Sequence, residues 1–178
     1  MTNTLGTLPD QRAMADRHAI EDVLHSHCRG LDRQDTALLL ACYWPDAEVD
    51  YGAYRGPAHS FAELVLPALA QTYELTRHCI SNILIELRGE RALAESYVTA
   101  GHLLLGAKAE MLFGGRYLDT LEQREGRWKL VHRQVVMDWS RQHAVTDERE
   151  SNAFTAMAKG GHGEGDPLPA FLQLTSKE

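Results

Sequence analysis

The chain has 178 residues, of which 44% are hydrophobic, and a formal net charge of −7 at neutral pH. This length and apolar content favour a single domain, and the negative charge gives no basic surface for a nucleic-acid backbone. No apolar run approaches the ~18 residues of a membrane-spanning helix, and residues 1–6 lack a secretory signal pattern. We therefore expect neither nucleic acid nor membrane as a partner.

The first half of the chain predicts helices. Apolar residues at helical spacing predict a helix from Ala13 to about Arg29. Asp35 is placed to cap a short second helix over residues 37–41. A short strand is expected from Ala47 to Tyr51.

A third helix is expected after Gly56. Pro57 would occupy its first position, where the missing N–H costs nothing. Pro67 would then kink this helix or split it in two.

The second half predicts four long strands separated by tight, glycine-containing turns. They cover Leu75–Arg88, Arg91–Gly106, Met111–Arg124 and Arg127–Ser140, and the pair Gly114-Gly115 indicates a bulge. Helices followed by a meander predict an α+β fold. We expect a cone-shaped, curved antiparallel sheet, an α+β barrel, with the three N-terminal helices packed on its concave face.

This domain should cover residues 13–140, after a flexible N-terminus at 1–12 and before a partly flexible C-terminal extension at 141–178. The glycine-rich run from 160 to 165 lacks the Lys-Ser/Thr ending of a phosphate-binding loop and is expected to be mobile. The three cysteines (Cys28, Cys42, Cys79) have no metal-ligand spacing, so we expect reduced thiols, no metal site and a cytoplasmic protein.

Asp32 and His78 give the strongest indication of chemistry. A carboxylate beside an imidazole fixes the imidazole tautomer and stabilises the imidazolium, which makes a general base. Asp32 could instead be a solvated turn residue, but its place at a helix C-terminus is unfavourable for the helix dipole and a buried role would explain it. His78 alone could be an ordinary core histidine.

The order and spacing of several segments resemble the SnoaL-like group of the nuclear transport factor 2-like superfamily, whose fold is a cone-shaped α+β barrel. The likeness spans about Ala13 to Trp139. The matching segments are the helix ending at Asp32, Tyr43–Ala47, the His78 strand with Ser81-Asn82, Ala94–His102, Gly115–Asp119 and Trp128–Arg133.

The resemblance implies site residues. Scytalone dehydratase, lindane dehydrochlorinase and bile-acid 7α-dehydratase are members that eliminate a leaving group from bulky cyclic substrates without a cofactor. The Asp–His dyad of lindane dehydrochlorinase and of bile-acid 7α-dehydratase matches Asp32 and His78, and scytalone dehydratase has a histidine that matches His78. Arg133 matches an arginine of the dehydrochlorinase, and Tyr51 and His102 match a tyrosine and a histidine of scytalone dehydratase.

His27 departs from these relatives, which have lysine or tyrosine there. It lies on the apolar face of the first helix, whereas His25 points elsewhere, so the two cannot share a metal. Arg133 shares its strand phase with apolar residues, which indicates a pocket. The expected substrate-binding side chains are His27, Arg133, Trp44, Val49, Phe113 and Met137.

This inventory suits proton abstraction followed by loss of a leaving group. We expect a cofactor-independent lyase, most simply a dehydratase of aromatic-compound catabolism, acting on a bulky aromatic or polycyclic small molecule. His78 would be the base, Asp32 would orient it, and Tyr51, His102 or His27 would donate to the departing oxygen or to an oxyanion.

Three alternatives stay open. The same dyad could cleave a C–C bond by a retro-aldol route, releasing a small aldehyde from an aromatic diol, or support isomerase or cyclase chemistry. The chain could also be a non-catalytic binding module or the small structural subunit of an aromatic-ring dioxygenase. Such a subunit would co-purify with a large partner.

The segment Ile80–Leu87 has apolar residues on both faces of the expected strand, and this predicts that the chain forms an oligomer. Simple alternation places Ile80 and Leu84 on one face and Ile83, Ile85 and Leu87 on the other. A sheet that is apolar on both faces needs a cover on its outer side. We expect a homo-oligomer, and the resemblance favours a trimer before a dimer.

Overall fold

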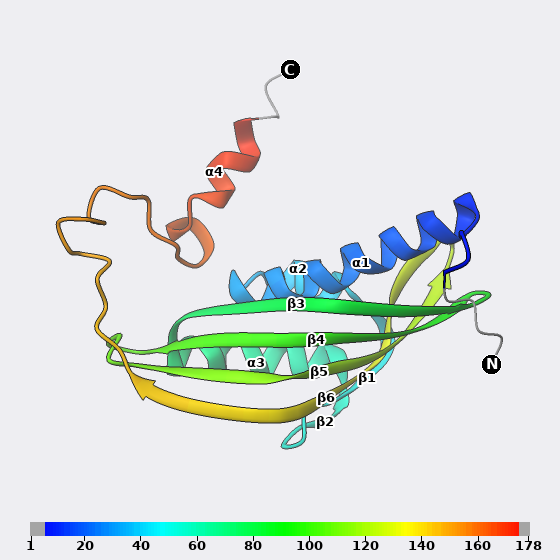
Figure 1. Cartoon of the computed structure of the whole chain (residues 1–178), viewed down its shortest axis with the longest axis horizontal. Helices are drawn as coiled ribbons and strands as arrows, with labels where there is room; N and C mark the ends of the chain where they lie inside the picture. The colour runs from blue at the N-terminus through cyan, green and yellow to red at the C-terminus, as the bar shows by residue number, and fades with distance from the viewer. Residues whose placement is uncertain (1–5, 175–178) are drawn as a thin grey trace.

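The computed structural model describes residues 6–174 as one curved sheet with helices on one side (Figure 1). The elements are α1 (Gln11–Asp32), α2 (Thr36–Ala41), β1 (Tyr43–Asp50), β2 (Arg55–Pro57), α3 (Ala58–Thr72), β3 (Tyr73–Arg88), β4 (Arg91–Leu104), β5 (Ala109–Arg124), β6 (Arg127–Ala144), a 3₁₀ turn (Gly163–Gly165) and α4 (Leu168–Gln173). Residues 1–5 of the predicted flexible N-terminus lie outside the described part.

The first two helices begin at residues whose side chains cap them. The Asp10 carboxylate accepts from the backbone N–H of Ala13 at 2.7 Å and starts α1. Asp35 caps α2 in the same way through Leu38 at 2.9 Å, which confirms the predicted cap. Pro57 precedes α3 and belongs to β2, and α3 runs through Pro67 without the predicted split.

The strand order is β2-β1-β6-β5-β4-β3, so β2 and β3 are free edges. Strands β3 to β6 form the predicted antiparallel meander. β1 pairs with β6 in parallel, a pairing that was not predicted from the sequence. The α+β cone fold is confirmed, but the sheet is open and mixed, not a closed antiparallel barrel.

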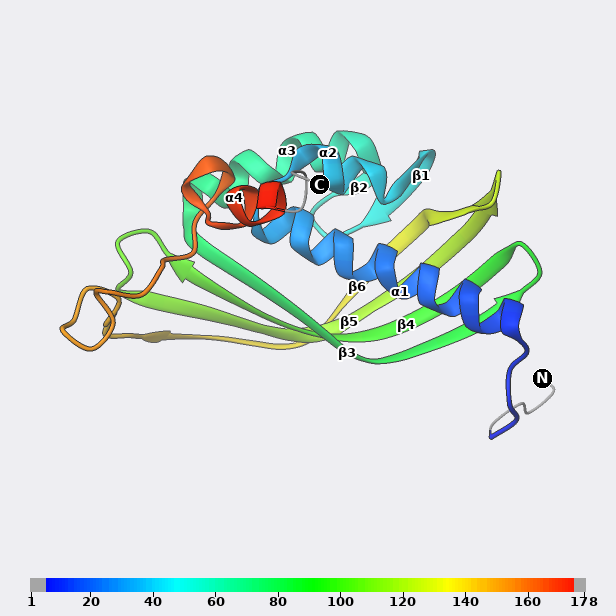
Figure 2. The ribbon, with the colours of Figure 1, turned by 90° about the horizontal axis from the view of Figure 1, so that it is seen from above.

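The three N-terminal helices cover the concave face of this sheet (Figure 2). Their apolar side chains meet those of the sheet in the main core, which includes Leu24, Leu39, Val49, Leu121 and Leu130. A smaller buried cluster joins Cys28 of α1 to Val98, Ala100 and Tyr117 of the sheet. The core thus lies between the helices and the inner face of the sheet.

Two irregularities change which side chains face inward. Pairing shifts between Gly114 and Gly115, at the predicted bulge. A second shift lies between Ser81 and Leu84, where Asn82 has φ +48°. Because of it, Ile80 packs against the core together with Ile83 and Leu87, while Leu84 is exposed. The prediction that Ile80 and Leu84 share a face is therefore wrong.

Beyond β6 the described part of the C-terminal extension reaches residue 174 and includes the short helix α4. Its glycine-rich run, predicted to be mobile, is contacted by Arg33, the residue that follows α1. Arg33 donates to the Gly161 carbonyl at 3.2 Å and to the Asp166 carboxylate at 3.0 Å. The extension thus returns to the end of α1.

Within residues 6–174 no helix is long and apolar enough to cross a membrane.

Candidate active site

The predicted partners Asp32 and His78 are in contact. Nδ1 of His78 lies 2.7 Å from Oδ1 of Asp32, and the backbone N–H of His78 donates to Oδ2 at 2.8 Å. Both side chains are about one-tenth exposed. Because an ionised carboxylate only accepts, Nδ1 carries the hydrogen, and whenever the ring is neutral Nε2 has the free lone pair.

The electrostatics of Asp32 fit this arrangement. Burial by itself raises the pKa of this carboxyl, but the hydrogen bonds and charge of His78 and a hydrogen bond from Thr76 outweigh burial. The pKa of Asp32 is therefore lower than usual and the group is ionised at neutral pH. The end of α1 and the adjacent edge strand β3 bring the two residues together.

His102 lies beside the dyad. Its ring makes an edge contact with His78, with centroids 5.3 Å apart, and a tilted contact with Tyr73. Burial, and then repulsion from the His78 ring when that ring is protonated, lower the pKa of His102 to about 4. Nδ1 of His102 is buried without a hydrogen-bond partner among residues 6–174. His102 is therefore a neutral ring that can still bind a polar group.

Arg133 and His27 belong to a buried polar chain. The fully buried Arg133 guanidinium makes two 2.7 Å hydrogen bonds to Asp119 through Nε and Nη2, and Nη1 donates to Nδ1 of His27 at 2.8 Å. Nε2 of His27 lies 2.8 Å from the hydroxyl oxygen of Tyr43. His27 is buried and His25 exposed, as predicted.

Tyr51 is close to this chain but not bonded to it. Its hydroxyl lies beside Arg133 and Tyr43 yet makes no hydrogen bond among residues 6–174. Its ring stacks on Phe61 with centroids 4.0 Å apart. Burial raises the pKa of Tyr51 although the Arg133 charge opposes this, so the group is a protonated phenol at neutral pH.

The other predicted substrate-binding residues are scattered. Val49 is buried in the main core and pairs with Arg133 across β1 and β6. Phe113 is on the cross-strand row of His78, with Ala100 between them, and so shares its face. Met137 is 65% exposed.

Trp44 is not brought to the dyad. Its indole N–H donates to the Glu122 carbonyl, and Arg124 and Lys129 lie over its ring near the β5–β6 turn. The indole packs against cations at the opposite end of β5 from Phe113.

Sequence reasoning missed two residues of the site, and for Tyr43, expected in the pocket lining, it did not predict the contact. Thr76 donates to Asp32 at 2.9 Å, Asp119 balances Arg133, and Tyr43 contacts His27. A signal for Thr76 was available, because residues two apart on a strand share a face. Asp119 is paired with Arg133 across β5 and β6. The sequence could not predict this pair, because it does not show which residues of two neighbouring strands lie opposite each other.

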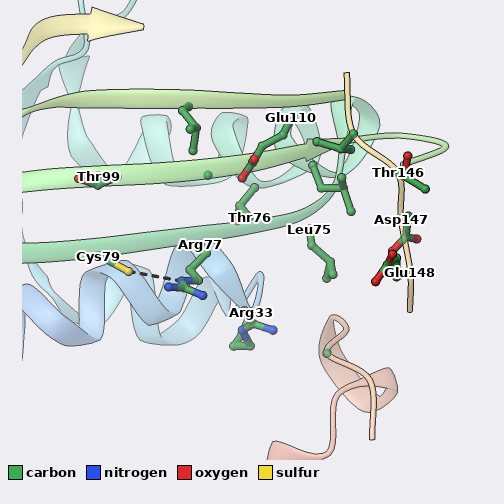
Figure 3. A pocket seen from close by; sticks show the side chains of 15 residues that line it. Arg33, Leu75, Thr76, Arg77, Cys79, Thr99, Glu110, Thr146, Asp147 and Glu148 are labelled. Carbon is green, nitrogen blue, oxygen red and sulfur yellow. Dashed lines mark hydrogen bonds between the residues drawn. The ribbon is translucent and has the colours of Figure 1, made fainter. Parts of the chain in front are cut away.

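A groove of about 580 Å³ lies on the other face of β3 and β4 (Figure 3). Cys79 and Thr99 line it, whereas their neighbours His78 and Ala100 point to the concave side. Residues 145–148 and Gly160 close one end. Thr76, which contacts Asp32, also lines the groove, but Cys79 points away from the side of the sheet that carries His78, so the two cannot act together. In the described part of the chain no three His, Cys, Asp or Glu side chains gather in a way that could hold a metal ion.

The chain is similar in sequence to a dehydrochlorinase. Over 128 residues the chain is 27% identical to hexachlorocyclohexane dehydrochlorinase 1 of Sphingobium indicum, covering 69% of this chain and 82% of the relative.

Two solved structures share the fold. A putative scytalone dehydratase from Novosphingobium aromaticivorans aligns with a TM-score of 0.68 at 24% identity, covering 75% of this chain and 91% of that one. A type 2 hexachlorocyclohexane dehydrochlorinase aligns with a TM-score of 0.66 at 24% identity, covering 78% and 94%.

The SnoaL-like domain family matches residues 12–134. This stretch holds α1, the first five strands and the part of β6 that carries Arg133. It therefore contains the dyad and the whole buried polar chain. The match and the open cone fold agree with the resemblance noted in the sequence, and the chain belongs to the SnoaL-like domain family.

Proposed function

We propose that this protein is a cofactor-independent lyase, a dehydratase-type enzyme acting on a bulky aromatic or polycyclic small molecule. The 2.7 Å contact between Asp32 and His78 carries the proposal. It leaves Nε2 of a neutral imidazole free to accept a proton from carbon.

In the proposed reaction, Nε2 of His78 takes a proton from a carbon of the substrate. The electron pair of that C–H bond forms a double bond, and the leaving group departs from the neighbouring carbon with its bonding electrons. Asp32 stays ionised and stabilises the imidazolium that forms, because both hydrogen bonds from His78 end on its carboxylate.

The leaving group needs a donor. His102 is neutral, since burial lowers its pKa to about 4, and can give a hydrogen bond without being a strong acid. The phenols near Arg133 are also protonated, because burial raises the pKa of both Tyr43 and Tyr51. One well-placed donor is worth on the order of 3 kcal/mol in the transition state.

The relatives support elimination as the reaction type. One is named as a dehydrochlorinase of hexachlorocyclohexane and another as a putative scytalone dehydratase. Both names describe loss of a small molecule from the substrate. The first test is therefore to incubate the purified chain with each of these two compounds and to follow chloride release and loss of scytalone.

A His78→Ala variant should lose nearly all turnover while keeping its melting temperature. His25→Ala is a matched control, because His25 is an exposed histidine on α1 and should keep full activity. Near-wild-type turnover by His78→Ala would falsify the base assignment.

A further inference from the structure

The groove between the sheet and the C-terminal extension has no part in the lyase reaction proposed above. Its volume of about 580 Å³ (Figure 3) is within the range of small-molecule sites, roughly 300–1,000 Å³. Neither Asp32 nor His78 lines it, and residues 145–148 and Gly160 close one end. A molecule bound there is therefore a second ligand and not the substrate of the dyad.

The floor of the groove is apolar. Leu75 of β3, Leu103 of β4 and Leu112 of β5 line it, and Val145 of the extension adds to them. Leu75 pairs with Leu103 across two strands, and Leu112 pairs with Gly101, so these positions share one face of the sheet. This apolar floor favours a ligand that has an apolar part.

Gly101 leaves a hollow in the floor. Its pairing with both neighbouring strands is regular and its φ is not positive, so neither a bulge nor a turn requires glycine. A Cβ there would meet Oε1 of Glu110 at 3.0 Å and Leu112 at 3.6 Å. At Gly114, by contrast, the indole of Trp139 fills the space, 2.4 Å from the Cβ position. Glycine inside a strand often marks a place where a ligand approaches closely.

The charged side chains of the groove are sorted by sign. Arg33 and Arg77 lie on its α1 side, whereas Glu110 lies toward β5, and Asp147 and Glu148 lie at the end formed by the extension (Figure 3). Among residues 6–174 no ion pair joins the two sets. Opposite charges therefore face the same apolar floor without contacting each other.

Two of these charges are balanced by partners that do not line the groove. Nη1 of Arg33 lies 3.0 Å from Oδ2 of Asp166, and Nη2 of Arg149 lies 2.8 Å from Oδ2 of Asp147. Arg33 and Asp147 therefore need no ligand.

Arg77 and Glu110 are not balanced in this way. Nε of Arg77 donates to the thiol of Cys79 at 3.5 Å, and a thiol is a weak acceptor. Glu110 has His143 at 3.5 Å, and this imidazole carries a charge only when it is protonated. Glu148 is exposed at the far end. Arg77 and Glu110 thus present one positive and one negative charge on either side of the hollow.

We propose that the groove binds a free α-amino acid with an apolar side chain. Arg77 holds its carboxylate, Glu110 holds its ammonium group, and the α-carbon lies over Gly101. The side chain of the ligand packs on the apolar floor. This binding site is additional to the dyad and does not depend on the lyase function.

A ligand with both charges suits the groove better than one with a single charge. A simple carboxylate pairs with Arg77 but is repelled by Glu110, and a simple amine pairs with Glu110 but is repelled by Arg77. An amino acid makes a charge-assisted hydrogen bond on each side. Its apolar side chain also removes the leucine floor from water, which favours binding in proportion to the area covered.

The test uses L-leucine as the probe and isothermal titration calorimetry on the full chain. We expect one leucine to bind per chain, with a Kd of about 1 mM or lower. The analogue 4-methylpentanoate lacks the ammonium group, and 3-methylbutylamine lacks the carboxylate. Each should bind at least about tenfold more weakly than leucine, because one charged hydrogen-bonding group is lost.

Three variants assign the binding to the groove. Arg77→Gln should remove the advantage of leucine over 3-methylbutylamine, and Glu110→Gln its advantage over 4-methylpentanoate. Gly101→Val should abolish binding by filling the hollow, and should keep the melting temperature, because valine suits a strand and the end of the Glu110 side chain can move. Arg88→Gln is the matched control, since this exposed arginine pairs with Glu86 at the other end of β3.

Several outcomes would overturn the proposal. It is wrong if leucine shows no saturable binding at about 10 mM, if either analogue binds as tightly as leucine, or if Arg77→Gln and Gly101→Val bind leucine like the wild type. Weaker leucine binding in His78→Ala would place the ligand at the dyad instead. Absence of leucine binding, together with a changed mass of Gly101→Val in light scattering, would show that another copy of the chain fills the groove.

Discussion

The hydroxyl of Thr76 donates to Oδ1 of Asp32, the same oxygen that contacts His78. Oδ2 accepts from the backbone N–H of His78. Three donors from one stretch of β3 therefore hold a single carboxylate at the end of α1. The carboxylate orients the imidazole only as well as these donors orient the carboxylate.

Asp32→Asn should be severe. The amide cannot take the charge of an imidazolium and can present an N–H to Nδ1, which holds the ring in the wrong tautomer. We expect a loss of kcat of about 10³–10⁴-fold with the fold intact. Steady-state kinetics on whichever compound proves to be a substrate will measure this, and a tenfold loss or less contradicts the orienting role.

Thr76→Val tests the support of the carboxylate. The substitution keeps the shape of the side chain and removes one hydrogen bond worth about 1 kcal/mol, so kcat should fall by about fivefold while KM changes little. Thr99→Val is the matched control, because Thr99 pairs with Cys79, whose side chain points to the opposite face of the sheet from His78. Equal effects of the two variants would show that Thr76 has no special role.

The buried histidine His102 makes stability depend on pH. Its pKa is about 4 in the folded protein, lower than the usual 6.5, so between these values only the unfolded chain takes up the proton. Folding stability therefore falls as pH drops from 7 toward 4, by about 2 kcal/mol at pH 5 from this group alone. The pKa of Asp32 is also below its usual value, so the stabilisation from its ionised form is lost at still lower pH.

Urea unfolding at pH 7 and pH 5 measures the effect. His102→Phe should lose part of the difference in unfolding free energy between the two pH values. His25→Gln, at an exposed position, should retain the wild-type difference. An unchanged difference in His102→Phe contradicts the neutral state of the ring.

The contact of Arg33 with the C-terminal extension should control access to that segment. Asp166 accepts from Arg33 and from the backbone N–H of Gly161. We expect Arg33→Ala to make the region from 145 to 165 more sensitive to limited proteolysis, with no change in the melting temperature. Arg55→Ala, which removes an exposed ion pair with Asp50, should leave the cleavage pattern unchanged.

Gly115 has no room for a side chain. A Cβ there would lie 2.1 Å from the carbonyl oxygen of Val136, so Gly115→Ala must displace β6 at the bulge. We expect a loss of about 2–3 kcal/mol in unfolding free energy. Gly165→Ala is the control, since a Cβ there meets nothing within 4 Å. Denaturant unfolding of both variants decides the point.

The outer face of the sheet should be covered by other copies of the chain. Leu84, Tyr97 and Trp139 are exposed by 67%, 48% and 47%, and alternation places them opposite the core. We expect light scattering to return a trimer, or else a dimer, and Tyr97→Glu to shift it toward the monomer. Leu64→Glu, at an exposed position of α3, should not. A wild-type monomer at micromolar concentration contradicts this prediction.

Regular patterns in the sequence predicted most of the fold. Apolar spacing and glycine turns located α1 and the four long strands, and the capping role of Asp35 came from its side-chain chemistry. The parallel pairing of β1 with β6 was not predictable, because it depends on where the chain returns in space. The shift at Asn82 was missed too, since a single residue with positive φ leaves no mark on the apolar pattern.

Part of the candidate site was likewise predictable from the sequence, and part was not. The Asp32–His78 contact was expected from the resemblance, and its distance agrees with that expectation. The role of Arg133 was not foreseeable from its apolar row, because that row shows a buried position without saying which partner balances the charge. Asp119 supplies that partner from the neighbouring strand. Trp44 illustrates the opposite error, since an aromatic side chain was assigned to the site on composition alone.

The strand order also determines when this site can form during folding. Strands β3 to β6 are hairpin neighbours in the chain and pair over short loops, so their loop-closure entropy is low. Val49 pairs with Arg133 across almost half of the chain, and the contact of His27 with Arg133 joins residues 106 positions apart. We expect the meander to form first and the addition of α1 and β1 to complete the site. A partial unfolding that releases only these two elements would then abolish the chemistry while leaving most of the sheet in place.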